Sequence, residues 1–372
     1  MFQRSLFTAG LLSASITTVH ALPYGFFDAR SVAMGNVSMA TGGVTTAALS
    51  NPGMLMVNEY DDSYALLLPA IGAQVIDDGN VIDLLDEFQA FNGSTDPNDL
   101  MRQREILLDI EGDSVIGAVI PNVAFVSSGE NFTWGITYRG NAVVSATVTD
   151  LVDVDPVGPN PDGTVRALGV AIQEIGIPMG SAVSLAGMQL SFGITPRYVQ
   201  VDVIEYSESI RTADLGDIQD TSSEDLGSFT TVDAGVALNL ADTFRVGLVA
   251  KNLIEETKVT SIGREIDFET HLRAGAAIDL GIVTLAADMD LTERKPIAGE
   301  NPSQSFSVGA EIDAFSTVQF RAGYQTNTAS GATDPDLLSV GVGIWLGFNL
   351  DIAAVVGDDS SYGAFIQTGF HF

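Results

Sequence analysis

The sequence predicts an all-β protein, a transmembrane antiparallel β-barrel of about 14 strands with an N-terminal plug segment and a helical first outer loop. Three observations predict this fold. The chain begins with an export signal, apolar residues alternate with polar or small ones through much of the chain, and the predicted connections are alternately long and short. After the signal, no segment has the roughly 18 unbroken apolar residues of a spanning helix, which leaves a closed barrel as the means of crossing a bilayer.

Composition narrows the classes of partner. The chain has 372 residues, of which 46% are hydrophobic and only 17% charged, and 16 Lys and Arg against 48 Asp and Glu give a net charge of −32. Nucleic acid is excluded as a partner because its phosphates need neutralisation by Lys and Arg. The absence of cysteine favours a large fold that needs no disulfides.

Residues 1–21 have the pattern of a secretory signal peptide. Arg4 supplies the positive charge, residues 6–16 are apolar, and Val19 and Ala21 are the small residues before a cleavage site after Ala21. An N-terminal anchor helix is the alternative, but the apolar stretch is short for a membrane span. We expect export across the inner membrane of a Gram-negative cell and insertion into the outer membrane.

Residues 61–372 are expected to form the barrel. In the last predicted strand Tyr362, Ile366, Phe370 and Phe372 share one face, and a terminal Phe of this kind resembles the signal read by the barrel-assembly machinery. The opposite face of the predicted strands is rich in Gly and carries isolated charges, as a lumen wall does. A soluble sandwich would place many Lys and Glu there instead. Acidic residues gather in the long connections, one of which is expected over residues 146–165, and this predicts an acidic outer rim.

Residues 78–112 interrupt the alternation with a helical pattern. Val81, Leu84, Leu85 and Phe88 lie on one helical face, and Asp96 followed by Pro97 marks the start of a second helix. We expect a helical hairpin in the first outer loop that caps the barrel mouth, either as a solvated decoration or as a lid.

Residues 22–60 are expected to form a plug or hatch inside the barrel. The segment is rich in Gly and in apolar residues such as Met34, Met39 and Leu55, and this apolar surface needs cover. Asn51, Pro52 and Gly53 form a turn motif, because Pro fixes φ, Gly permits positive φ and Asn bonds its own backbone. A periplasmic tail followed by a turn is the alternative.

These motifs carry a family resemblance. The segment Ala29-Arg30-Ser31 with Ala33-Met34-Gly35, followed by Asn51-Pro52-Gly53-Met54-Leu55, resembles the start of outer-membrane barrels related to the FadL long-chain fatty-acid transporters. Residues 61–73 and 81–89 are similar to the barrel-type family called plasmid-transfer protein TraF. The strong resemblance covers about residues 22–110, and further on only the barrel pattern matches. It implies a plug within the barrel and a passive route for small hydrophobic molecules.

The predicted inner face contains charged residues that are candidates for lining the lumen. In the order of the sequence they are Arg139, Arg197, Asp233, Arg245, Arg273, Asp279, Glu311 and Arg321. They line an aqueous path, or they brace the wall and hold the plug; the sequence leaves both interpretations open, and bracing is the simpler.

We expect neither catalysis nor a cofactor. Only His271 and His371 remain after processing, no Cys is present, and a structural zinc site needs such ligands. The expected partners are outer-membrane lipid and a small hydrophobic ligand. Passive transport is therefore the favoured function, and a structural or interaction role at the cell surface, implied by the TraF name, is the alternative. An outer-membrane enzyme is the least favoured class.

Overall fold

The structure is a computed structural model. It describes residues 28–57, 63–154, 157–185, 187–214, 221, 223–295, 302–314, 317–331, 334–357 and 361–372. The predicted signal peptide, residues 1–21, lies outside this part of the chain. Within this part, none of the helices combines the length and apolar character that a membrane span requires.

Most of the described chain is β-strand. The strands are β1 (Tyr64–Asp77), β2 (Ser114–Ser127), β3 (Thr133–Val154), β4 (Val157–Gly176), β5 (Met179–Leu185), β6 (Met188–Ser209), β7 (Glu224–Leu240), β8 (Phe244–Lys251), β9 (Glu256–Val259), β10 (Glu265–Phe268), β11 (His271–Asp279), β12 (Val283–Asp290), β13 (Ser305–Ala314), β14 (Val318–Asn327), β15 (Leu337–Trp345), β16 (Asn349–Gly357) and β17 (Tyr362–His371). The helices are α2 (Ala29–Ala33), α3 (Val44–Leu49), α4 (Val81–Ala90) and α5 (Pro97–Asp109), with 3-10 helices η1 (Pro52–Met56) and η2 (Asp78–Asn80).

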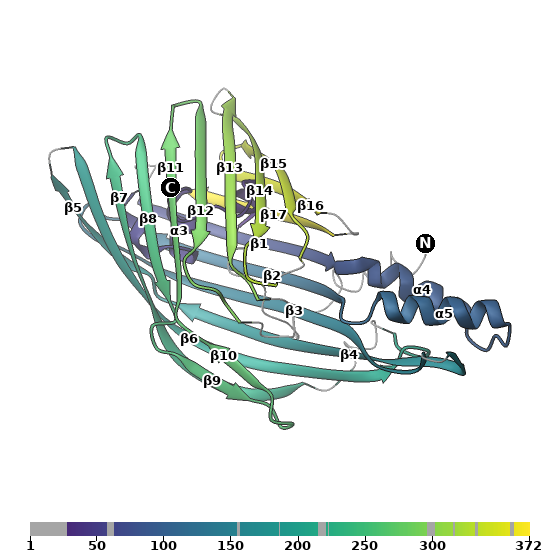
Figure 1. The fold of residues 1–372 in the computed structure, drawn as a ribbon. Helices are drawn as coiled ribbons and strands as arrows, with labels where there is room; N and C mark the ends of the chain where they lie inside the picture. Colours follow the sequence, from purple (N-terminus) through teal and green to yellow (C-terminus); the bar gives the residue numbers. More distant parts are fainter. Residues whose placement is uncertain are drawn as a thin grey trace.

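The large sheet closes on itself as an antiparallel barrel (Figure 1). Neighbouring strands in the sequence pair with one another, and β1 pairs with both β2 and the last strand, β17. The closure continues to the last residue, because the backbones of Tyr64 and Phe372 exchange hydrogen bonds of 2.9 and 3.0 Å. The predicted fold class is confirmed.

The described part of this sheet has 15 strands, one more than the 14 expected. The difference arises in one wall position, where β4 and β5 lie end to end between β3 and β6. Residues Ile177 and Pro178 separate them. Proline has no backbone N–H to give to the ladder, so a strand is readily interrupted there.

The outward face of the barrel is apolar and carries aromatic residues at one rim. Large hydrophobic side chains such as Leu190, Phe192, Val246 and Phe320 are exposed there, which suits contact with lipid hydrocarbon. At the rim with the short connections, aromatic rings gather in pairs: Tyr64 with Phe125 and Phe372, Phe125 with Trp134, and Phe348 with Phe370. Such rings are enriched at the membrane–water interface.

Strands β3 and β4 are longer than the sequence indicated. The sequence predicts a long connection over residues 146–165, but all described residues of this range are strand. The paired backbone of β3 continues from Thr137 to Val154. Asp150 and Asp153 have positive φ there, and the register shifts beside them. This part of the hairpin projects beyond the rest of the wall (Figure 1), where polar residues on a strand face water rather than lipid.

The helical hairpin packs on the outer face of these long strands, and this differs from the expected cap over the mouth. Along β6, Val201 and Val203 face the interior cluster described below, whereas the alternate residues Ile204 and Tyr206 contact the cluster of α4 and α5. Successive residues of a strand point to opposite faces, so the helices and the lumen lie on opposite sides of the sheet. The sequence pattern identified the apolar helix face but not the sheet face that it covers.

Within the hairpin, α4 and α5 are joined by an ion pair. The Arg102 guanidinium donates hydrogen bonds of 2.7 and 2.9 Å to the Glu87 carboxylate. These bonds hold the pKa of Glu87 below its usual range. The Asp96 side chain caps α5 by accepting a hydrogen bond from Asn98 N, with Pro97 in the first turn.

Candidate functional site: the plugged barrel interior

Residues 28–57, here called the inner segment, lie inside the barrel and are almost wholly buried. Two polar side chains hold its parts together. Asp28 caps α2 by accepting a hydrogen bond of 2.7 Å from Ser31 N, and it also accepts one from the Thr46 hydroxyl in α3. Asn51 caps η1 by accepting from Gly53 N at 3.0 Å, and its amide donates to the Met39 carbonyl at 3.0 Å. The Asn51-Pro52-Gly53 motif therefore begins a 3-10 helix and ties the two halves of the segment together.

The inner segment rests on glycines of the wall, with backbone against backbone. The glycine track consists of Gly193, Gly235, Gly247, Gly275, Gly309, Gly323 and Gly341, contributed by β6, β7, β8, β11, β13, β14 and β15. A Cβ at Gly247 would lie 1.9 Å from the Met39 carbonyl oxygen, and one at Gly323 would lie 1.9 Å from Gly35 N. Atoms cannot approach so closely, so only glycine permits this contact.

The track contains three cross-strand glycine pairs. Gly193 pairs with Gly235, Gly247 with Gly275, and Gly309 with Gly323. It is interrupted at β12, where Asp288 stands beside Gly275. The Asp288 carboxylate accepts hydrogen bonds from the backbone of Ser38 and Met39 at 2.7 and 3.0 Å. At β12, where Asp288 stands in the row of glycines, the wall therefore binds the inner segment through a side chain.

Arg30 of α2 joins a chain of charges on the wall. Its guanidinium contacts Glu311 of β13 at 2.8 Å, Glu311 contacts Arg321 of β14 at 2.5 Å, and Arg321 contacts Asp351 of β16 at 2.5 Å. Gln367 of β17 then donates to Asp351 at 2.9 Å and accepts from Ala29 N at 2.7 Å. The contacts return to α2, so the helix is held from both sides.

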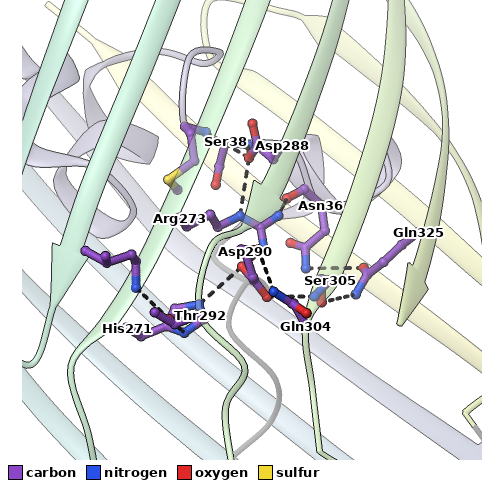
Figure 2. A network of polar contacts seen from close by, with 12 residues as sticks. Asn36, Ser38, His271, Arg273, Asp288, Asp290, Thr292, Gln304, Ser305 and Gln325 are labelled. Atoms are coloured by element: carbon purple, nitrogen blue, oxygen red, sulfur yellow. Dashed lines mark hydrogen bonds and ion pairs between the residues drawn. The ribbon is translucent and has the colours of Figure 1, made fainter. Parts of the chain in front are cut away.

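A second polar network surrounds the elbow of the inner segment between α2 and α3 (Figure 2). Arg273 has no exposed surface, and it contacts Asp290 at 3.0 Å and Asp288 at 3.5 Å. Its remaining amino group donates to the Asn36 carbonyl at 3.0 Å. Charges buried in this way are stable only when each is paired.

His271 in the same network lies between a hydroxyl and a carboxylate. Its Nδ1 is 3.0 Å from the Thr292 hydroxyl and its Nε2 is 3.2 Å from Asp290. The same hydroxyl accepts a hydrogen bond from Leu272 N, and the same carboxylate binds Arg273. These groups are engaged in internal contacts, which is an arrangement for holding the elbow rather than for nucleophilic attack.

A third group of charges lies at the end of α3. Arg139 contacts Glu174, and Arg197 contacts Glu174 at 2.8 Å and Asp233 at 2.6 Å. The Leu49 carbonyl at the end of α3 accepts hydrogen bonds from Arg139 at 3.1 Å and from Lys251 at 3.4 Å. Cations are favourable at the carboxyl end of a helix, where backbone carbonyls lack partners.

The eight predicted lumen residues fall into two classes. The following contact the inner segment or belong to the networks that hold it: Arg139, Arg197, Asp233, Arg273, Glu311 and Arg321. Arg245 and Asp279 contact each other at 3.5 Å near the short-turn rim instead. The sequence interpretation missed Arg30, Glu174, Asp290 and Asp351. Strand alternation places the three acidic residues on the same faces as the predicted ones, but no sequence signal identified Arg30 as a partner.

Beside α2, the interior is filled by an apolar cluster, here called the inner apolar cluster. Its members are Ala29, Val32, Ala33, Ile76, Ile116, Ala118, Ile120, Val143, Leu168, Val170, Ile172, Val199, Val201, Val203, Ile266, Phe268, Leu337, Ala353, Val355 and Phe365. The ring of Phe268 in the β9–β10 hairpin packs at a tilt against the ring of Phe229 in β7, with ring centres 4.9 Å apart. The cluster brings together strands from both sides of the barrel, so the lumen is occluded by hydrocarbon at this level.

Solved structures with the same fold are similar to this chain at low sequence identity. The TodX deltaS2S3 mutant monoaromatic hydrocarbon channel is 11% identical over 94% of this chain and 99% of that chain, with a TM-score of 0.56. The CymD monoaromatic hydrocarbon channel is 12% identical over 93% and 97%, with a TM-score of 0.55. The Ralstonia pickettii toluene transporter TbuX is 12% identical over 94% and 98%, with a TM-score of 0.54. At this identity the likeness shows the fold alone.

Sequence comparison identifies the family. No curated protein matches the chain. Residues 48–290 match the family model described as F plasmid transfer operon, TraF, protein. This match spans more than half of the 372 residues, from the end of α3 to the last residue of β12. The chain therefore belongs to the TraF family of the F plasmid transfer operon.

Proposed function

We propose that this chain is an outer-membrane barrel that lets small hydrophobic molecules pass passively, with the inner segment as its plug. The inner apolar cluster is the observation that carries the proposal. A barrel that conducts only water and ions needs a polar lumen, whereas this interior is lined by Val, Ile, Leu and Phe next to the plug. Likeness of fold to hydrocarbon channels supports the same class of cargo.

The inner segment is held by contacts that are reversible. Ion pairs and hydrogen bonds join it to the wall, and its backbone lies against the glycine track without covalent links. Displacement of α2 would open the inner apolar cluster, because Ala29, Val32 and Ala33 are part of it. A hydrocarbon molecule that takes the place of these side chains buries a similar apolar surface, so the exchange costs little free energy.

Val201→Thr tests the transport proposal. This substitution keeps the shape of a fully buried cluster residue but replaces one methyl group with a hydroxyl, which an apolar passage disfavours. We expect cells that produce the wild type to take up radiolabelled toluene several-fold faster than cells that lack the protein, and the variant to lose most of this gain. Val183→Thr, on the exposed outward face, is the matched control and should behave as wild type. Equal uptake with and without the protein would exclude this function.

A structural or interaction role at the cell surface is the second candidate. The family description favours this role. The α4–α5 hairpin is the candidate interaction surface, because these helices lie outside the lumen. Replacing residues 81–109 by a short Gly-Ser loop should then reduce mating frequency in donor cells, while Val201→Thr should not. The opposite pattern, or no change with either variant, would exclude this candidate.

A further inference from the structure

Gln74 of β1 has its side chain in the inner apolar cluster. Its neighbours in register are Ala118 of β2 and Gly363 of β17, and Ile76 follows two residues later on the same face. Ala118 and Ile76 both belong to the cluster. The side chain is 2% exposed, so it has almost no access to water from outside the barrel.

Both polar atoms of the Gln74 amide lack a hydrogen-bond partner within the described residues. The same holds for the hydroxyl of Ser145 on β3, which is paired in register with Ile116 and Leu168 of the cluster. Burying an amide or a hydroxyl without a partner is unfavourable, and native proteins rarely leave such groups unsatisfied. A buried amide with two free atoms among hydrocarbon side chains therefore indicates that a further molecule completes the site.

The chemistry around Gln74 restricts what that molecule is. The cluster consists of hydrocarbon side chains, so the body of a ligand must be apolar. The amide offers one donor group and one acceptor, which matches a hydroxyl or a carbonyl. A carboxylate would need a cation, and Arg30, Arg139 and Arg197 are each already paired with acidic side chains. An unpaired buried charge is strongly disfavoured.

We propose that Gln74 forms the polar part of a ligand site in the inner apolar cluster for a neutral hydrocarbon that carries one hydroxyl or carbonyl oxygen. The proposal rests on the proposed function and specifies its substrate class. The plug helix α2 covers this site from one side, since Val32 and Ala33 belong to the same cluster. A molecule that takes the place of the α2 side chains supplies the partners that the Gln74 amide lacks among the described residues.

Equilibrium binding to the purified full-length barrel tests this site. Tritiated 1-decanol, decane and decanoate are measured by scintillation proximity in one detergent, for the wild type, Gln74→Leu and Ser145→Ala. The ratio of the decanol to the decane dissociation constant is compared between proteins, because partition into micelles then cancels. We expect Gln74→Leu to weaken decanol binding relative to decane by about tenfold, the value of one hydrogen bond to a buried neutral group.

The controls keep the outcomes distinct. Gln74→Leu should not lower the melting temperature, because it removes an unsatisfied buried amide and keeps a similar volume. Ser145→Ala should leave the decanol-to-decane ratio unchanged, because β2 lies between Ser145 and Gln74 and the two residues are offset along the strands. Decanoate should bind none of the proteins more tightly than decanol. If the decanol-to-decane ratio is the same in all three proteins, water alone satisfies the amide and the proposal is wrong. Toluene uptake can persist in that case, so transport is judged separately.

Discussion

Arg273→Met is expected to lower the free energy of unfolding by about 3–5 kcal/mol, as removal of one partner of a buried ion pair does elsewhere. Arg273 has no exposed surface, and Asp288 and Asp290 depend on it for compensation. The variant also removes the donor to the Asn36 carbonyl. The elbow of the plug therefore loses its fixation at the same time as two carboxylates lose their countercharge.

Urea unfolding of the barrel in lipid vesicles, followed by the mobility shift of the folded protein on gels, measures this loss. Arg166→Met is the matched control, because Arg166 and Asp150 form an ion pair that is 57% and 54% exposed. Exposed pairs contribute about 0–1 kcal/mol. Adding Asp288→Asn and Asp290→Asn to Arg273→Met should restore much of the stability. Equal losses for Arg273→Met and Arg166→Met would contradict the role given to this network.

The fold was accessible from the sequence because its signals are local. Alternation of apolar residues in β14, β15 and β17 depends only on neighbours two positions apart, and the membrane makes that pattern strict. Where strands leave the lipid the rule weakens. The sequence therefore indicates a connection over residues 146–165, although its described residues are strand. The helices of residues 81–109 were expected from their own periodicity, but the side of the sheet that they cover depends on the alternate faces of β4 and β6.

The candidate site was accessible only in part, because its contacts join distant residues. Alternation placed Glu311 and Arg321 on the inner face, but Arg30 is 281 positions from Glu311 and its pairing has no local signal. Glycines on the inner face indicate a lumen wall. That the backbone of the inner segment lies against these glycines can be predicted only when the path of that segment is known. Gln74 stands in an apolar run, and only the packed structure shows that its amide lacks partners among the described residues.

Gly247→Ala is expected to displace the plug and to open the barrel to ions. The added Cβ would lie 1.9 Å from the Met39 carbonyl oxygen and 2.8 Å from the Asn51 amide nitrogen. The wall strand is fixed by its pairing with β7 and β11, so the inner segment must move instead. Overpacking of this kind costs about 1–3 kcal/mol. We expect this cost to weaken the contacts of the plug with the wall rather than the pairing of the barrel strands.

Planar-bilayer recordings measure the opening, and limited proteolysis of the inner segment measures its displacement. Wild type should show little conductance because the inner apolar cluster and the plug occlude the lumen, whereas Gly247→Ala should conduct and be cleaved within residues 28–57. Gly369→Ala is the matched control, since Gly369 is also a buried strand glycine but its added Cβ would meet nothing nearer than 3.6 Å. If the two alanine variants conduct equally, close packing on the glycine track is not what keeps the barrel shut, and closure then depends on the apolar cluster alone.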